Sequence, residues 1–332
     1  SLTNESWAAD FVSAQLFDSR LAVDVNYYVK NTTDLLLDFN LPEALGISSI
    51  TRNAGEMSNR GVDLNIRSTN VRTQDFEWTT SLNMGFLENE IEDLPGASVD
   101  PEGNPFIQGT ASQRAIVGHS ANTFYLVRYN GLNDEGDATW LDSEGEVTTS
   151  YSSSNRVIVG TAIPDFTGGL TNTIRYKGLD FSFLFNFVYG NDVMLDELRF
   201  TENIIGGFNL STRVLDYWTP DNRDAFAPSP DSPTAATFAA RSTSQLMDGS
   251  FLRLRNITLG YTIKGDDVGV GALSRARFYV MGQNLWTLVA DDFRGQDPEV
   301  NDAGAGDNLS QGESFFTPPQ PQMVTVGVNI TF

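Results

Sequence analysis

Apolar and polar residues alternate with a period of two along most of this chain. The clearest segment, Leu179–Tyr189, has leucine, phenylalanine or tyrosine at every odd position, with Asp180, Ser182 and Asn186 between them. Because successive side chains of a β-strand point to opposite faces, such a segment has one apolar face and one polar face. The same alternation recurs in four further segments: Leu21–Lys30, Val62–Arg67, Phe76–Phe86 and Val324–Phe332.

Weaker alternation fills most of the remaining chain. Thr167–Tyr176 and Ala276–Leu288 keep one phase, Glu5–Leu16 is ambiguous, and Phe251–Ile263 changes phase between Leu254 and Ile257. A change of phase within a strand indicates a β-bulge. Together the segments predict about nine strands of roughly 10 residues, the length that a tilted strand needs to cross a bilayer. Strands of soluble proteins are shorter, usually about 5–6 residues.

The connections between these strands alternate strictly between short and long. Short ones are Phe17–Arg20, Val71–Asp75, Lys177–Gly178 and Lys264–Arg275, and long ones are residues 35–60, 90–166, 190–250 and 289–321. Successive antiparallel strands place successive connections at opposite ends of a sheet. Outer-membrane barrels have short periplasmic turns and long extracellular loops. The pattern therefore predicts an all-β, antiparallel transmembrane sheet with its long links on the extracellular side.

The strand number also predicts an incomplete barrel. Bacterial single-chain barrels use even strand numbers and leave no open edge. About nine strands cannot close in that way, so we expect an open, strongly curved sheet. Glu5–Leu16 is expected at one edge and Gln322–Phe332 at the other.

Composition excludes several classes of function. The chain has no cysteine, a single histidine and a formal net charge of −22. A thiolate metal site is impossible, and nucleic-acid binding, which needs basic clusters, is not expected. Nucleophilic catalysis needs a base beside the nucleophile, and His119 is the only histidine. We therefore expect no enzyme activity and no cofactor.

Several motifs resemble the SusC/RagA branch of the TonB-dependent outer-membrane receptors. NAGEMSNRGVDLNI (Asn53–Ile66) resembles a strand of that family, and DGSFLRLRNITLGYTI (Asp248–Ile263) resembles another. The remaining matches follow in the family's order: DVNYYVKNTTDLLL (Asp24–Leu37), GTAIPDFTGGLTN (Gly160–Asn172), DYWTPDNRDA (Asp216–Ala225), YVMGQNLWTL (Tyr279–Leu288) and DPEVN (Asp297–Asn301). Each match alone is weak, but together and in order they cover nearly the whole chain.

The resemblance implies a 22-stranded barrel of which residues 1–332 supply the C-terminal strands, while the family's plug domain is absent from this sequence. It also implies TonB-dependent uptake of oligosaccharides or peptides through the outer membrane, together with a SusD-like surface lipoprotein. The TonB complex would act through the missing plug. The terminal strand, ending at Phe332 on the periplasmic side, would be recognised by the barrel-assembly machinery.

Two other functions remain open from the sequence. A passive porin-like channel would share the barrel but lack the plug and TonB coupling. A soluble, secreted, glycan-binding β-sandwich or adhesin would need a partner sheet to cover the apolar face of Leu179–Tyr189.

Candidate site residues fall into three groups, each with a simpler structural explanation. Calcium prefers carboxylate and carbonyl oxygens, so the acidic stretch around Asp134, Asp137 and Asp142 is a weak metal candidate, although it lacks EF-hand spacing. Aromatic residues of the long links are candidates for contact with a ligand or with the lid protein: Trp140, Tyr217, Trp218, Phe315 and Phe316. Polar strand residues are candidates for lining the barrel lumen: Asp63, Asn65, Arg67, Glu77 and Asn83.

Overall fold

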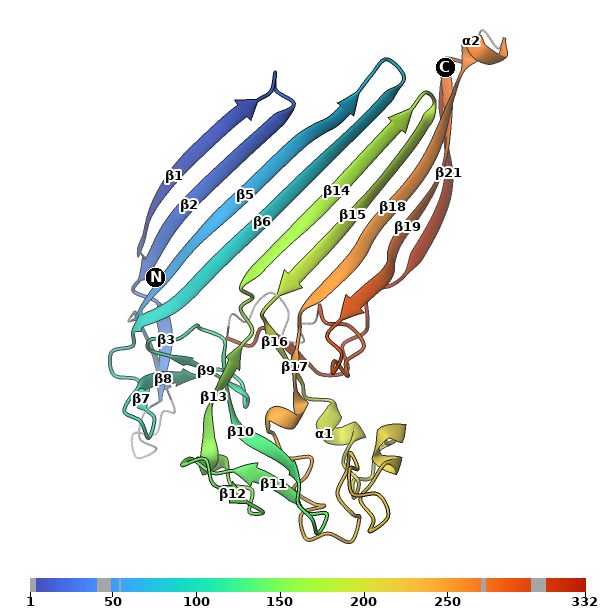
Figure 1. Cartoon of the computed structure of the whole chain (residues 1–332). Coiled ribbons are helices and arrows are strands. Elements are labelled where there is room, and N and C mark those ends of the chain that lie inside the picture. The colour runs from blue at the N-terminus through green and yellow to red at the C-terminus, as the bar shows by residue number, and fades with distance from the viewer. Residues whose placement is uncertain (1–3, 41–48, 54, 270–272, 300–308) are drawn as a thin grey trace.

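Nine long strands form one antiparallel sheet in the computed structural model, which describes residues 4–40, 49–53, 55–269, 273–299 and 309–332 (Figure 1). Each strand is hydrogen-bonded to the sheet strands that precede and follow it in the chain. In spatial order they are β1 (Asn4–Leu16), β2 (Leu21–Thr33), β5 (Glu56–Arg72), β6 (Phe76–Asp93), β14 (Phe166–Tyr176), β15 (Leu179–Tyr189), β18 (Phe251–Lys264), β19 (Arg275–Val289) and β21 (Met323–Thr331).

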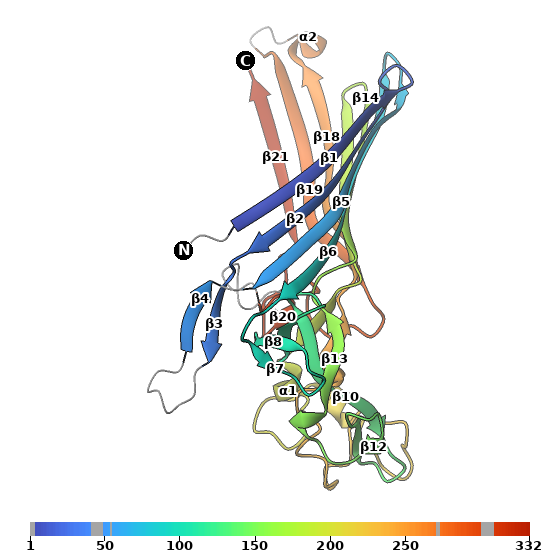
Figure 2. The same ribbon diagram turned by 90° about the vertical axis from the view of Figure 1, so that its left-hand side faces the viewer.

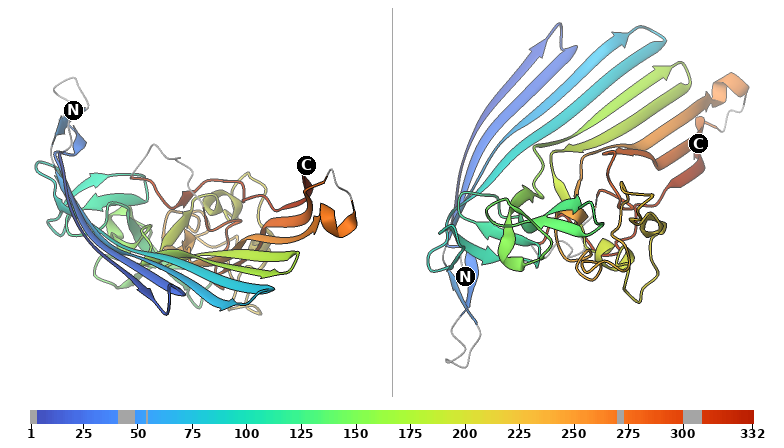
Figure 3. Two further views of the ribbon diagram at one scale, coloured as in Figure 1. Left: turned by 90° about the horizontal axis from the view of Figure 1, so that it is seen from above. Right: turned by 60° about the horizontal axis from the view of Figure 1, so that its bottom comes forward.

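The sheet is curved and open. Figure 3 shows its strands along an arc, with β1 and β21 at opposite ends. Within the described residues, β1 pairs only with β2, and β21 pairs only with β19. The predicted strand number, antiparallel order and two edges are therefore confirmed. The predicted bulge is confirmed as well, since the pairing of β18 with both neighbours skips Arg255.

The short links are tight turns at one end of the sheet. Phe17–Arg20, Lys177–Gly178 and the three residues between β5 and β6 join neighbouring strands directly, as the sequence predicts. The link between β18 and β19 contains a single helical turn, α2 (Gly265–Val268). None of the helices in the described ranges is long and apolar enough to cross a membrane.

The long links at the other end are folded, which the sequence analysis did not anticipate. We call the described parts of residues 94–165, 191–250 and 290–322 the loop module. It contains short strands and helical turns: β7 (Ser98–Val99), β8 (Pro105–Gln108), β9 (Gln113–Ile116), β10 (Thr123–Leu132), β11 (Ala138–Leu141), β12 (Val147–Thr148), β13 (Arg156–Thr161), β16 (Asp192–Leu195), β17 (Leu246–Asp248), β20 (Glu313–Ser314), α1 (Leu198–Thr201), and the 3-10 turns η2 (Ser153–Asn155), η3 (Thr212–Leu215) and η4 (Thr243–Gln245).

The first long link is shorter than expected. Strand β5 already begins at Glu56, and a hairpin of β3 (Leu36–Asn40) and β4 (Ser49–Asn53) occupies part of the predicted loop. The hairpin stands apart from the loop module in the side view (Figure 2). In β3, Leu37 and Phe39 alternate with Asp38 and Asn40 as in the long strands, so periodicity alone does not show where β2 ends.

Nearly all fully buried apolar residues lie in the loop module. One cluster surrounds Trp140, Val127 and Phe238, and a second joins Phe124 and Leu126 to Met194. The nine-stranded sheet instead exposes its apolar residues, including Val326, Leu259 and Tyr261. The long links therefore fold into compact structure, because their apolar residues form cores of their own.

Candidate functional site

The five candidate lumen residues share one face of the sheet. Directly opposed residues on neighbouring strands lie on the same face. Asn65 on β5 is opposite Asn83 on β6, and Asp63 and Arg67 lie two positions to either side of Asn65. Glu77 lies on the same face of β6 as Asn83, six residues away. The structure therefore brings together all five on a polar face.

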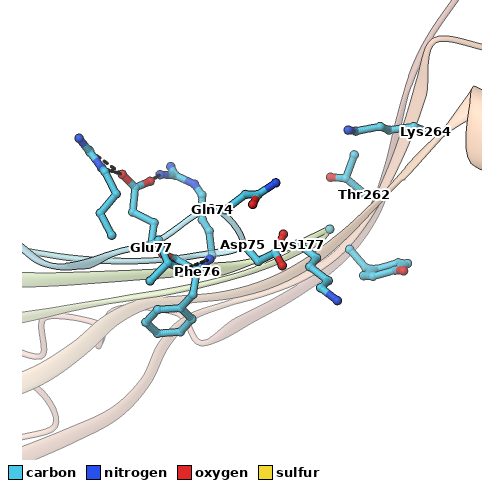
Figure 4. A pocket seen from close by; sticks show the side chains of 12 residues that line it. Gln74, Asp75, Phe76, Glu77, Lys177, Thr262 and Lys264 are labelled. Carbon is cyan, nitrogen blue, oxygen red and sulfur yellow. Dashed lines mark hydrogen bonds and ion pairs between the residues drawn. The ribbon is translucent and has the colours of Figure 1, made fainter.

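This polar face is on the concave side of the sheet. Figure 4 shows Glu77 and Gln74 on the side toward which the strands bend, whereas Phe76 points to the opposite side. The convex side carries the apolar alternation. Phe181, Phe183 and Phe185 follow one another along β15 with ring centroids 5.7 and 5.6 Å apart. The sheet thus has a polar concave surface and an apolar convex surface.

Charged side chains join neighbouring strands on the concave face near the short turns. The carboxylate of Glu77 accepts hydrogen bonds from Arg72 at 2.7 Å and from Arg175 at 3.0 Å. Asp180 binds Arg277 through two hydrogen bonds, at 2.9 and 2.5 Å. The sequence analysis named only Glu77 and missed its partners. The same period of two already places Asp180 on the polar face of Leu179–Tyr189, and it would have placed Arg175 and Arg277 there as well.

Trp140 is not available for contact with a ligand. Its side chain has 0% of its surface exposed, because β11 lies against β10 inside the loop module. The rings of Tyr129 and Tyr151 meet it edge-on, with centroids 6.4 and 5.6 Å away. The expectation of a surface role for Trp140 is therefore wrong. A large aromatic in a link rich in polar residues serves here as a core residue.

The other loop aromatics remain accessible to different degrees. Tyr217 is exposed, while Trp218 is partly buried. Phe315 and Phe316 are 43% and 52% exposed. Their rings form a connected group with Phe200 and Phe208, with successive centroid distances between 5.1 and 5.4 Å. We call these four residues the aromatic patch.

Phe316 has a backbone conformation that phenylalanine rarely adopts. Its φ is +54°, in the left-handed region. For a bulky residue this conformation is strained, and such strain persists only where the surrounding structure enforces it. The neighbouring segment is fixed by β20, which pairs with β16. The fold therefore maintains a strained position that presents an exposed ring beside Phe315.

The acidic candidates for a metal site do not converge. Asp142 accepts the N–H groups of Glu144 and Glu146 and so caps a hairpin turn. Asp137 accepts a hydrogen bond from the Ser232 hydroxyl. Among the described residues, no group of three or more acidic or histidine side chains is placed to hold a metal ion. Turn formation accounts for Asp142, and the geometry offers no shared site for Asp134 and Asp137.

Buried charges hold the loop module together. Arg241 binds Asp196 through two hydrogen bonds of 2.9 and 3.0 Å, and Arg294 pairs with Glu202 at 2.7 Å. Burial raises the pKa of Glu202 above its ordinary value, although the two nearby arginines, Arg294 and Arg213, oppose this effect. Asp196 and Glu202 flank α1, so these pairs connect both ends of α1 to arginines that lie later in the chain. They rigidify the module, and no nucleophile and base come together in them.

A buried arginine connects the sheet to the last long link. Arg253 on β18 is only 2% exposed and pairs with Asp297. Asp297 also accepts the N–H of Gln320 at 2.8 Å and that of Glu299 at 2.9 Å. Glu299 in turn binds Arg255, the bulge residue. The bulge at Arg255 and the segment Asp297–Glu299 therefore act together to anchor the last long link on the sheet.

Comparison with known proteins gives a consistent group of relatives. TonB-dependent receptor P26 of Formosa agariphila is 33% identical over 97% of this chain, and SusC of Bacteroides thetaiotaomicron is 29% identical over 85%. The solved structure of the RagAB peptide transporter matches 99% of this chain with a TM-score of 0.83 and 26% identity. No family model matches the sequence.

The chain spans only about a third of these relatives. The aligned part is 34% of receptor P26, 28% of SusC and 35% of the matched chain of the RagAB structure. Both sequence and fold agree over nearly the whole of the present chain. The relatives are named as receptors and a transporter, not as enzymes.

Proposed function

The chain is a segment of a SusC/RagA-like TonB-dependent receptor, and on this premise we propose that it forms the C-terminal wall of an outer-membrane barrel for nutrient uptake. The whole receptor would import oligosaccharides or peptides in a TonB-dependent manner. A SusD-like lipoprotein would cover the ligand at the loop module. The short turns would face the periplasm, and Phe332 would contribute to recognition by the barrel-assembly machinery.

The two-faced sheet is the observation that carries this proposal. Leu259, Val280 and Val326 belong to three neighbouring strands, and all are at least 47% exposed on the convex face. Water does not favour such a continuous apolar surface, whereas hydrocarbon does. Every strand between β1 and β21 has both backbone edges paired, as a bilayer requires. A soluble sandwich or adhesin would need a second sheet to cover this face.

The polar concave face would line a hydrated path through the barrel. The loop module would supply the binding surface at the extracellular end of this path. Asp63, Asn65, Arg67, Glu77 and Asn83 would hydrate the lumen wall. The aromatic patch, with Tyr217 and Trp218 nearby in the chain, would contact either the ligand or the lipoprotein, since exposed rings stack on sugars and pack against apolar side chains. The relative RagAB is a peptide transporter, which supports peptides as one ligand class.

Uptake by cells that carry the full-length receptor tests this function. Labelled oligosaccharide or peptide should enter only when the TonB complex is active. Import that continues unchanged without TonB would instead support the passive channel. Replacing Phe315 and Phe316 with alanine should reduce ligand capture. Leu215→Ala is a matched control, because Leu215 is exposed in the same module but makes none of the ring contacts of the patch.

A further inference from the structure

All three segments of the loop module meet at the short strand β20, which belongs to the last of them. The strand pairs with β16 of the second segment, where the N–H groups of Met194 and Asp196 donate to carbonyl groups of the last segment. The carboxylate of Glu313, in β20, accepts a hydrogen bond from the hydroxyl of Thr110 in the first segment. Because β20 has only two residues, its position depends on such side-chain contacts as well as on backbone pairing.

A second carboxylate, that of Glu197, also holds β20. Its Oε1 accepts a hydrogen bond from the hydroxyl of Ser314 at 3.1 Å. Its Oε2 is buried and has no hydrogen-bond partner among the described residues. A buried carboxylate that is only partly hydrogen-bonded is costly when it is charged, and the cost falls when it takes up a proton. The surroundings of Glu197 therefore favour its neutral form.

Neither carboxylate has a cationic partner of its own. In the part of the chain that the structure describes, Glu197 and Glu313 form no ion pair. The guanidinium groups of Arg199 and Arg241 are both bound to Asp196, whose negative charge acts on the two glutamates. The joint between β16 and β20 thus combines three carboxylates with two guanidinium groups that are already engaged.

Burial raises the pKa of both Glu197 and Glu313 above the ordinary value of 4.5. Hydrogen bonds from neighbouring hydroxyl groups oppose the shift in both cases, and Arg241 opposes it for Glu313, whereas the charge of Asp196 adds to it. The folded joint therefore binds protons that the unfolded segments would release. Its stabilisation by these groups is complete below the ordinary pKa and is lost as the pH rises through the raised pKa values.

Strand β20 leads directly into the strained part of the aromatic patch. Phe315 and Phe316 follow it in the chain, and Phe316 has a φ of +54°. Such a conformation persists only while the surrounding contacts enforce it. Phe315 also packs against Phe200, which comes from the second segment, with ring centroids 5.4 Å apart. Loosening of β20 would release the strain at Phe316 and separate these rings from Phe200.

We propose that β20 is a proton-sensitive latch, which holds the aromatic patch together in acid and releases it as Glu197 and Glu313 lose their protons. The latch itself depends only on the fold of the loop module. Its consequence for uptake rests on the proposed function, in which the patch contacts the ligand or the lipoprotein. Ligand capture by the whole receptor is then strongest at acidic pH and declines as the pH rises.

Hydrogen exchange in the full-length receptor tests the latch. The double variant Glu197→Gln with Glu313→Gln replaces both acids by neutral amides, which resemble the protonated carboxyl groups. Peptides that contain Ser314 and Phe316 should exchange several-fold more slowly in the variant than in the wild type at about pH 8. At about pH 3.5, below the ordinary and the raised pKa values, the two proteins should exchange at nearly equal rates.

The control variant is Glu144→Gln, because Glu144 is an exposed glutamate in a hairpin turn of the same module. It should exchange like the wild type at both pH values.

The wild-type receptor gives a second readout that needs no substitution. Phe200 is partly buried and contacts Phe315 and Phe208, whereas Tyr217 is an exposed ring outside the patch. Labelling of Phe200 by hydroxyl radicals, relative to that of Tyr217, should therefore increase between about pH 3.5 and about pH 8. The ratio of the two rings cancels any effect of pH on radical yield.

The outcomes separate this inference from the proposed function. Equal exchange of the wild type and the double variant at about pH 8, or the same difference at both pH values, would overturn the latch. A ratio of Phe200 to Tyr217 labelling that does not change with pH would do so too. If these changes are absent from a receptor that imports ligand, the latch fails and the uptake function stands. Both changes in a receptor without TonB-dependent import would support the latch and contradict the function.

Discussion

The nine-stranded sheet and the loop module differ in the burial of their apolar side chains. In the loop module Trp140, Phe124 and Met194 are fully buried, as in a water-soluble domain. In the sheet, Tyr261, Phe278 and Val324 are about half exposed or more on the convex face. One chain therefore contains a region that provides its own core and a region whose apolar face requires a different solvent.

This difference separates the sources of stability of the two regions. Hydrophobic burial within the protein stabilises the loop module, so it should unfold like a soluble domain when a core residue is removed. The sheet depends on backbone pairing and on lipid, so it should respond to polarity on its convex face and tolerate change on its concave face. The predictions that follow test this separation.

The largest effect is expected from removing the central ring of the loop module. Trp140→Ala leaves a cavity among Val127, Phe238 and neighbouring rings and should destabilise the module by about 3–5 kcal/mol. Protease treatment of intact cells should then cut the module. The heat-modifiable migration in gels, which reports the folded barrel, should stay unchanged. Equal loss of both would show that the two regions do not fold separately. Leu215→Ala, at an exposed position, is the control.

A similar loss of stability is expected at the junction between the sheet and the last long link. Arg253→Met leaves the buried carboxylate of Asp297 without its partner, which costs about 3–5 kcal/mol in comparable buried pairs. Hydrogen exchange should rise around Gln320, whose N–H binds Asp297. Adding Asp297→Asn should recover much of the loss. An unchanged exchange rate in the single variant would mean that this pair does not anchor the link.

Two adjacent residues of β15 test the faces of the sheet. Phe183 lies on the convex face and Ser182 on the concave face. Arginine at a lipid-facing position near the middle of the bilayer costs about 2–4 kcal/mol, whereas a lumen position tolerates it. Phe183→Arg should therefore reduce folded barrel in the outer membrane far more than Ser182→Arg, as measured by heat-modifiable migration. The reverse order would assign the faces the other way round.

The smallest effect concerns pH and a single carboxyl group of the loop module. Burial, with a further contribution from nearby Asp248, raises the pKa of Asp192 from 3.8 to about 6, although the hydrogen bond donated by the Thr161 N–H opposes this shift. Between these two pKa values the folded state holds a proton that the unfolded state releases. The stabilisation by this group is thus complete below about pH 4 and is lost as the pH rises through about 6.

Asp192→Asn should remove this pH dependence, because asparagine resembles the protonated acid. Hydrogen exchange of peptides that contain Thr161 and Asp192 should be slower in the variant than in the wild type at pH 7, and nearly equal at about pH 3, below both pKa values. Comparing the two proteins at the same pH cancels the intrinsic pH dependence of exchange. A constant difference at both pH values would contradict the assignment.

Much of the sheet could be predicted from the sequence, but the loop module could not. Alternation gave the strands, and the alternation of link lengths gave their order and the edges β1 and β21. The period of two depends only on residues that are neighbours in the chain, so it can be recognised in the sequence without knowledge of the fold. The core around Trp140 joins β10 and β11 to Ala227 and Phe238, which are about 90–110 residues away in the chain. A local sequence pattern contains no information on contacts between such distant residues.

The candidate site shows the same limit. Asn65 and Asn83 could be placed on one face because each belongs to a strand of clear phase. The ion pair of Arg277 with Asp180 passes over Gly260 of the strand between them, and this neighbourhood can be recognised only when the register is known. The aromatic patch likewise draws Phe200 and Phe315 from two different links.

Sidedness in living cells tests the central claim most directly. Cysteine can be placed at Glu144, an exposed hairpin tip of the loop module, and at Gln74, in an exposed short turn, because residues 1–332 contain no cysteine. A membrane-impermeant maleimide added to intact cells should label Glu144→Cys in the full-length receptor, and should label Gln74→Cys only after the outer membrane is opened. Labelling of Gln74→Cys on intact cells, with Glu144→Cys protected, would contradict the proposed orientation. Equal labelling of both in a soluble fraction would contradict membrane residence itself.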